Sequence, residues 1–169
     1  DAGYLTSSSA MELRVAPPRL AIIGGGFVGM EQGQLFARLG SQVTIIGRLA
    51  PRAEPELAER LRRVFGDEAI TLVEERATAV EHSGADKAVV TASGQRIPAD
   101  EILVAVGRRP RTIGIGLDQA GVELDDAGFV RANDQQRTSN PRIYAAGDVT
   151  GAPQFVYVAA AQGTLAAEH

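Results

Sequence analysis

A glycine turn directly after an apolar run is the feature that most constrains the fold of this chain. Leu20–Ile23 is a short apolar run, and Gly24-Gly-Gly-Phe-Val-Gly29 follows it without a break. The pattern predicts a strand, a tight turn and a helix, the geometry that sets a pyrophosphate against the free N–H groups of a helix N-terminus. Gly24 would allow the turn, Gly26 would let the backbone approach a phosphate, and Gly29 would let helix and strand pack closely. The alternative is a glycine-rich turn that binds nothing.

The segment after the next predicted strand indicates which dinucleotide such a turn would select. Val43–Ile46 ends about twenty residues after Gly24, where a chain selecting NAD has an acidic residue that accepts from the adenosine ribose 2′-OH. Gly47 occupies that position here, and Arg48 and Arg52 follow it. A carboxylate would repel a 2′-phosphate, whereas a guanidinium can bind it in bidentate fashion. We therefore expect a preference for NADP(H), with Arg48 as the first contact and Arg52 as the second, unless both are solvated loop charges.

The remaining pattern predicts an α/β fold of Rossmann type. Three short strand-like runs replace a helical crossover and indicate an antiparallel β-meander before a buried strand returns to a parallel sheet. A capping box at Ser9–Glu12 would open a short helix near the N-terminus. The predicted helices are about 28–39, 54–65 and 155–168, and the predicted strands are 20–23, 43–46, 70–73, 78–81, 87–91, 96–97, 101–106 and 143–146. The fold class is thus a three-layer Rossmann-like domain with a trailing strand and helix.

Composition excludes several classes of function. The net charge is −4, with 17 basic and 21 acidic residues, so a nucleic-acid partner is not expected. Apolar runs are too short for a membrane span, and the N-terminus lacks a basic start and an apolar core, which favours a cytoplasmic protein. The chain has no cysteine, which excludes a disulfide or a thiolate site within it, and its two histidines, His82 and His169, do not suggest a metal site.

Three motifs in this order carry a family resemblance. They are Gly24-Gly-Gly-Phe-Val-Gly-Met-Glu31, Val104-Ala-Val-Gly-Arg-Arg-Pro110 and Ile143-Tyr-Ala-Ala-Gly-Asp148. The chain resembles the FAD-dependent pyridine nucleotide–disulfide oxidoreductases over essentially its whole length. Within that family, Arg48 and the segment Gln154–Gly163 are most similar to mercuric reductases.

The resemblance implies a larger parent enzyme. Family members have an FAD-binding region with a redox Cys-x4-Cys pair and a C-terminal dimerisation domain, and this sequence contains neither. Residues 1–18 are therefore expected to come from the missing FAD domain, 19–140 to form the NADP(H)-binding domain, and 141–169 to be a strand and helix of the FAD domain. The parent is expected to be a homodimer that retains FAD, which the fragment would not.

Roles for individual residues follow from the resemblance. Gly24, Gly26 and Gly29 would hold the NADPH pyrophosphate, Phe27 would be the aromatic gate between nicotinamide and flavin, and Glu31 would lie beside the nicotinamide. Gly107 would approach the nicotinamide end, Asp148 would bind the flavin ribityl chain, and the Val156 N–H would donate to the isoalloxazine edge. The predicted cofactor-binding set also includes Val28 and Ala77. Taken alone, Gly147-Asp148 is a turn signal and Glu31 an exposed helix glutamate.

The function implied is transfer of reducing equivalents from NADPH through FAD and a dithiol to Hg(II) in the intact enzyme, with the fragment inactive alone. Dihydrolipoamide dehydrogenase, or another disulfide reductase of the family, is the alternative enzyme. A stand-alone NADP(H)-binding regulatory module is the alternative outside catalysis, and the parent sequence beyond both ends would distinguish them.

Overall fold

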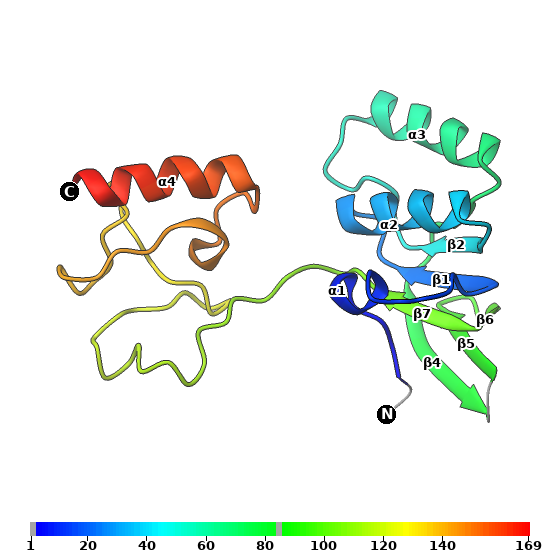
Figure 1. Ribbon diagram of the computed structural model, residues 1–169, viewed down its shortest axis with the longest axis horizontal. Coiled ribbons are helices and arrows are strands. Elements are labelled where there is room, and N and C mark those ends of the chain that lie inside the picture. Colours follow the sequence, from blue (N-terminus) through cyan, green and yellow to red (C-terminus); the bar gives the residue numbers. More distant parts are fainter. Residues whose placement is uncertain (1–2, 84–85) are drawn as a thin grey trace. The chain divides into compact units, whose positions relative to one another are not determined.

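The computed structural model describes residues 3–83 and 86–169, which divide into two compact units (Figure 1). Unit 1 is Asp1–Gly107 and unit 2 is Arg108–His169. Every helix in the described part of the chain is too short or too polar to span a bilayer.

Unit 1 is built around a parallel sheet with the strand order β3-β2-β1-β7. The strands are β1 (Arg19–Ile23), β2 (Gln42–Ile46), β3 (Thr71–Val73) and β7 (Glu101–Val104). Ile22 lies opposite Ile45 in β2 and Leu103 in β7, and all three side chains are fully buried. The sheet is covered on both faces, which explains the nearly unbroken apolar runs. Because the strands are parallel, the segments that follow them converge at one edge.

Two helices cover one face of this sheet (Figure 1). They are α2 (Phe27–Arg38) and α3 (Pro55–Asp67), with Pro55 in the first turn of α3 as the pattern predicts. Phe36 of α2 and Phe65 of α3 belong to the same buried cluster as the β1 and β2 side chains. The α2 helix ends with paired hydrogen bonds from Gly40 and Ser41 back to its last turn, so Gly40 stands at the predicted position after the C-cap.

An antiparallel sheet covers the other face and replaces the helical crossover. Its strands, in the order β4-β5-β6, are β4 (Ala77–Ser83), β5 (Asp86–Thr91) and β6 (Arg96–Ala99). A second buried cluster joins Val89 and Ile97 of this sheet to Ala21 and Ile102 of the parallel sheet. The predicted turn between the first two of these strands contains residues 84–85, which lie outside the described residues. The three layers confirm the predicted fold class.

The first helix differs from its prediction. Helix α1 spans Ser7–Ala10, and its capping box pairs Thr6 with Ser9, not Ser9 with Glu12. The Ser9 N–H donates to Thr6 Oγ1 at 3.2 Å, and the Thr6 N–H donates to Ser9 Oγ at 2.9 Å. The prediction was wrong by three residues because a serine hydroxyl fills the role usually given to glutamate or glutamine.

The N-terminal segment also joins the parallel sheet. The Leu5 N–H donates to Ile102 O at 2.7 Å, and Leu5 O accepts from the Val104 N–H at 2.9 Å, which places Leu5 beside β7. The predicted strand 101–106 ends early, at Val104, and Val106 is 71% exposed. The predicted 1–18 segment therefore packs with unit 1 in its described part.

Unit 2 has little regular structure before its final helix. It contains a small cluster around Val122, Val130 and Ala145, a 3₁₀ turn η1 (Gly147–Thr150), and helix α4 (Val156–Glu168). The predicted strand 143–146 makes one isolated bridge, Arg137 to Tyr144, because the described part of unit 2 provides no neighbouring strand for a longer ladder. The chain divides into compact units after Gly107. The predicted bounds of the nucleotide-binding domain, 19–140, and of the flavin-domain segment, 141–169, stay predictions.

Candidate functional site: a dinucleotide cradle at the start of α2

In the glycine turn between β1 and α2, backbone packs closely around Gly24 and Gly29, whereas Gly26 faces open space. Gly24 has φ of +114°, and a Cβ there would lie 2.4 Å from Ala105 O. A Cβ on Gly29 would lie 1.9 Å from Gly24 O, so only glycine allows the helix to approach the turn this closely. A Cβ on Gly26 would meet nothing within 4 Å. Gly24 and Gly29 thus serve packing, whereas Gly26 faces space that a ligand could use.

The N-terminus of α2 is suited to an anion. Gly26 is the N-cap and has no side chain, so the first-turn amides receive no side-chain cap. The first turn contains no acidic residue. The helix dipole and N–H groups such as that of Val28 therefore favour a phosphate at this end. The residues present fit a dinucleotide pyrophosphate.

The loop between β2 and α3 presents the two predicted arginines. Gly47 follows Ile46 with φ of +125°, a conformation in which an acidic side chain would be strained. Arg48 and Arg52 are exposed, and neither forms an ion pair within the described ranges. Both guanidinium groups are therefore available to a phosphate that approaches this loop.

A carboxylate also lies at this loop, and sequence reasoning missed it. Glu74 follows β3 directly, and its Oε1 accepts from the Leu49 N–H at 3.3 Å and from Arg62 Nη2 at 2.9 Å. The pKa of Glu74 lies below its ordinary value, chiefly because Arg62 donates a hydrogen bond to the carboxylate. Burial opposes this shift, and the charge of Arg48 lowers the pKa slightly further. The sequence did hold one signal for this contact, because Glu74 directly follows β3, the strand adjacent to β2.

The remaining predicted positions of unit 1 lie on separate elements. Phe27 and Glu31 are one helical turn apart at the start of α2 and share a face; Phe27 is 57% exposed. Gly107 is exposed beyond the end of β7, with φ of +134°. Ala77 begins β4 and packs partly buried against the second cluster. Ala77 thus has a packing role whether or not it touches a coenzyme.

In unit 2, the turn that contains Asp148 is hydrogen-bonded to helix α4. Asp148 lies in η1, and its Oδ2 accepts from Arg108 Nη1 at 2.8 Å. Gln162 of α4 accepts from the Gly147 N–H at 2.6 Å, which ties the helix to the turn. Val156, the first residue of α4, is 85% exposed, and the helix has no side-chain cap. Neither the Arg108 nor the Gln162 contact could be read from sequence, because each joins residues fifteen or more positions apart.

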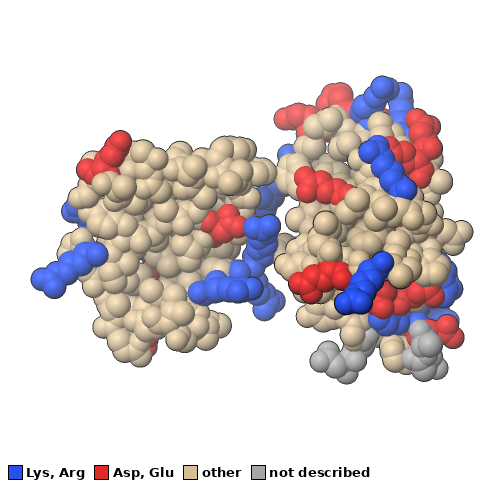
Figure 2. Space-filling model, in the orientation of Figure 1, with Lys and Arg blue, Asp and Glu red and all other residues tan. Residues whose placement is uncertain are grey.

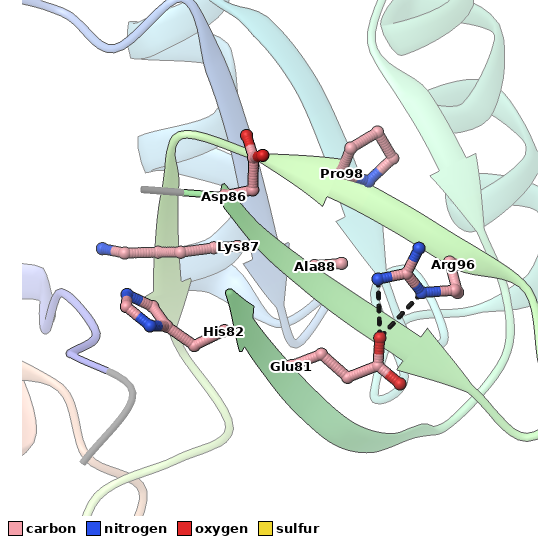
Figure 3. A pocket seen from close by; sticks show the side chains of 7 residues that line it. All are labelled: Glu81, His82, Asp86, Lys87, Ala88, Arg96 and Pro98. Carbon is pink, nitrogen blue, oxygen red and sulfur yellow. Dashed lines mark hydrogen bonds and ion pairs between the residues drawn. The ribbon is translucent and has the colours of Figure 1, made fainter. Parts of the chain in front are cut away.

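A separate hollow lies on the antiparallel sheet (Figure 3). This cavity of about 590 Å³ is lined by residues of β4, β5 and β6 and by none of the predicted site residues. Glu81 and Arg96 pair across it at 2.7 Å, and Lys87 pairs with Glu101 at 2.6 Å. Its charges are therefore largely satisfied within the protein. The α2 turn, with its open Gly26 and exposed arginines, is therefore the better candidate site.

Comparison with known proteins agrees with the geometry. The family described as pyridine nucleotide-disulphide oxidoreductase matches residues 2–163. A mercuric reductase of Streptomyces lividans is 48% identical over 98% of this chain and 36% of its own length. A dihydrolipoyl dehydrogenase of Thermus scotoductus is 41% identical over 90% of this chain and 35% of its own length.

A solved structure shares the backbone arrangement. The HOCl-induced flavoprotein disulfide reductase RclA from Escherichia coli, in its Cu(II) complex, matches 96% of this chain and 38% of its own, with a TM-score of 0.89 and 27% identity. The chain thus spans about a third of the length of the curated relatives it matches.

Proposed function

The chain belongs to the pyridine nucleotide-disulphide oxidoreductase family, and from this premise we propose that it is the NADP(H)-binding portion of a flavoprotein mercuric reductase. In this proposal the intact enzyme also holds FAD, passes electrons through a dithiol to Hg(II), is a cytoplasmic homodimer, and contacts neither nucleic acid nor membrane. The chain alone binds the coenzyme and is inactive.

One observation carries the proposal. The N-terminus of α2 has no side-chain cap, Gly26 there faces open space, and the adjoining loop presents two exposed arginines that form no ion pair within the described residues. The backbone amides at Gly26 and Val28 would hold the pyrophosphate, and Arg48 and Arg52 would hold the 2′-phosphate. A carboxylate at position 47 would oppose that phosphate, and glycine occupies the position.

The neighbouring residues would position the reacting end of the coenzyme. The bound nicotinamide supplies the hydride for which FAD is the acceptor in this family. Phe27 would gate access to that ring, Glu31 on the same helical face would lie beside it, and Gly107 would leave room for its approach. Asp148 in unit 2 would accept from a ribityl hydroxyl, and the Val156 N–H would donate to the flavin edge.

Dihydrolipoamide dehydrogenase is the second candidate, supported by the 41% identity to the Thermus scotoductus relative. The higher identity to the Streptomyces lividans mercuric reductase favours Hg(II) as substrate. A vicinal cysteine pair at the end of the parent chain would support this choice, because thiolates suit soft metals.

Calorimetric titration of this chain with NADPH and NADH tests the binding function. We expect NADPH to bind at least about tenfold more tightly, because charge-assisted contacts from arginine to the 2′-phosphate are strong. Arg48→Glu should invert the preference, since it adds repulsion as well as removing attraction.

Arg142→Glu is the matched control, because Arg142 is an exposed arginine of unit 2 that forms no ion pair within the described residues. It makes the same charge change and should leave the ratio of affinities unaltered. Equal affinity for the two coenzymes in the unmodified chain would refute the role of Arg48.

A further inference from the structure

Glu74 places a negative charge beside the proposed 2′-phosphate site. The parallel pairing of β2 with β3 sets Ile46 opposite Val73, and the Gly47 N–H donates to Val73 O at 2.9 Å. The next residue, Glu74, accepts from the Leu49 N–H. The carboxylate therefore holds the loop immediately after Arg48 while opposing any phosphate that approaches it.

Arg62 neutralises this carboxylate from the adjacent helix. Its Nη2 lies 2.9 Å from one Glu74 oxygen and 3.2 Å from the other. Arg62 also lies 3.3 Å from Glu59, one turn earlier on α3. The Arg62 and Glu74 side chains are 35% and 39% exposed, so the pair is partly screened by water. Acidic and basic side chains are interspersed over the face of unit 1 drawn in Figure 2. The described part of this face therefore has no broad basic patch to attract a phosphate, and individual charge pairs such as Arg62 and Glu74 decide the local charge.

We propose that Arg62 strengthens the preference for NADPH without touching the coenzyme: it cancels the charge of Glu74, so that Glu74 can fix the Arg48 loop without repelling the 2′-phosphate. This inference rests on the proposed function, because it concerns the same site. Under this inference Arg62 is a positioning residue that acts through Glu74. Glu74 itself has two opposed effects: its hydrogen bond to Leu49 fixes the loop, and its charge repels the 2′-phosphate.

The two effects separate by substitution. Arg62→Gln leaves the Glu74 charge uncancelled, so NADPH affinity should fall about three- to fivefold, a change within the range of a partly exposed charge pair. NADH affinity should stay unchanged, because NADH has no 2′-phosphate. Glu74→Gln keeps a carbonyl oxygen for the Leu49 N–H and removes the charge, so NADPH affinity should rise about twofold.

A double variant and two controls complete the experiment, which is calorimetric titration of the whole chain with NADPH and with NADH. Arg62→Gln combined with Glu74→Gln should restore the NADPH-to-NADH ratio to at least that of the unmodified chain. Arg63→Gln is the matched control: Arg63 is the next residue on α3, carries the same charge and pairs with Glu59 but not with Glu74. Arg63→Gln should leave the NADPH-to-NADH ratio unchanged. Arg62→Lys keeps the positive charge and should retain most of the preference for NADPH.

The outcomes distinguish this inference from the function on which it rests. If the NADPH-to-NADH affinity ratio stays constant in Arg62→Gln while both affinities fall together, Arg62 has only a structural role. That result overturns this inference but leaves the proposed function standing. A failure of Glu74→Gln to restore the ratio in the double variant overturns it equally. An unmodified chain without preference for NADPH overturns the proposed function and the inference together.

Discussion

Gly26 and Gly29 are separated by less than one helical turn but meet opposite surroundings. Gly26 borders open space at the helix N-terminus, and its φ of −78° suits any residue. Gly29 faces the Gly24 carbonyl oxygen, which a Cβ would approach to 1.9 Å. In the proposed site, Gly26 would therefore border the ligand, whereas Gly29 serves packing.

This difference predicts two distinct phenotypes. Gly26→Ala should fold with stability within about 0.5 kcal/mol of the unmodified chain and lose NADPH affinity at least about tenfold, because its methyl group occupies the phosphate approach. Gly29→Ala should be destabilised by about 1–3 kcal/mol through forced separation of helix and strand. Urea denaturation and titration of both variants would check this, and a Gly26→Ala chain that binds NADPH normally would contradict the cradle.

At the scale of elements, one ion pair ties the start of β1 to the turn between β6 and β7. Arg19 Nη2 lies 2.7 Å from one Asp100 oxygen, while the Arg19 N–H and Nε donate to the other at 2.8 and 3.1 Å. The side-chain hydrogen bond from Arg19 is the largest cause of the lowered pKa of Asp100. A folded pKa below the ordinary value of 3.8 means that this carboxylate contributes stability above pH 3.8 and loses it as the pH falls further.

Asp100→Asn should therefore be less stable than the unmodified chain at pH 7, and the gap should shrink as the pH falls from about 5 to about 3. Thermal unfolding monitored by circular dichroism across that range measures the gap. A gap that stays constant with pH would mean that the aspartate acts through backbone geometry and not through its charge.

The regular elements of unit 1 were predictable because each depends on local pattern. The β-branched run 43–46 and the apolar run 20–23 became β2 and β1, and Gly40 marked the end of α2. The capping box of α1 was misplaced because Thr6 and Ser9 use two hydroxyl groups, a pairing that sequence templates with glutamate or glutamine overlook.

The contacts that tune the site were not predictable, because they join distant residues. Glu74 reaches Leu49 across 25 positions, and Arg108 reaches Asp148 across 40. The strand expected at 143–146 makes one bridge in the described chain, from Tyr144 to the nearby Arg137, and its apolar pattern did not predict so short a pairing. Fold class and the glycine cradle follow from spacing, whereas charge pairing follows only from tertiary structure.

At the scale of the whole molecule, the proposed coenzyme site belongs to unit 1 and the proposed flavin contacts to unit 2. Among the described residues, unit 1 has two buried clusters on the faces of its parallel sheet, and unit 2 has one of its own. The central claim is that the end of β1 and the start of α2 hold the pyrophosphate, with the Arg48 loop holding the 2′-phosphate.

Amide chemical shifts of the isotopically labelled chain, recorded while NADPH is added, test this claim most directly. We predict the largest changes at Gly24–Gly29, which would border the pyrophosphate, and at Gly47–Leu49, whose Arg48 side chain would bind the 2′-phosphate. With NADH, the first group should respond and the second should respond much less. Changes centred instead on the hollow of β4–β6, or on unit 2, would contradict the account.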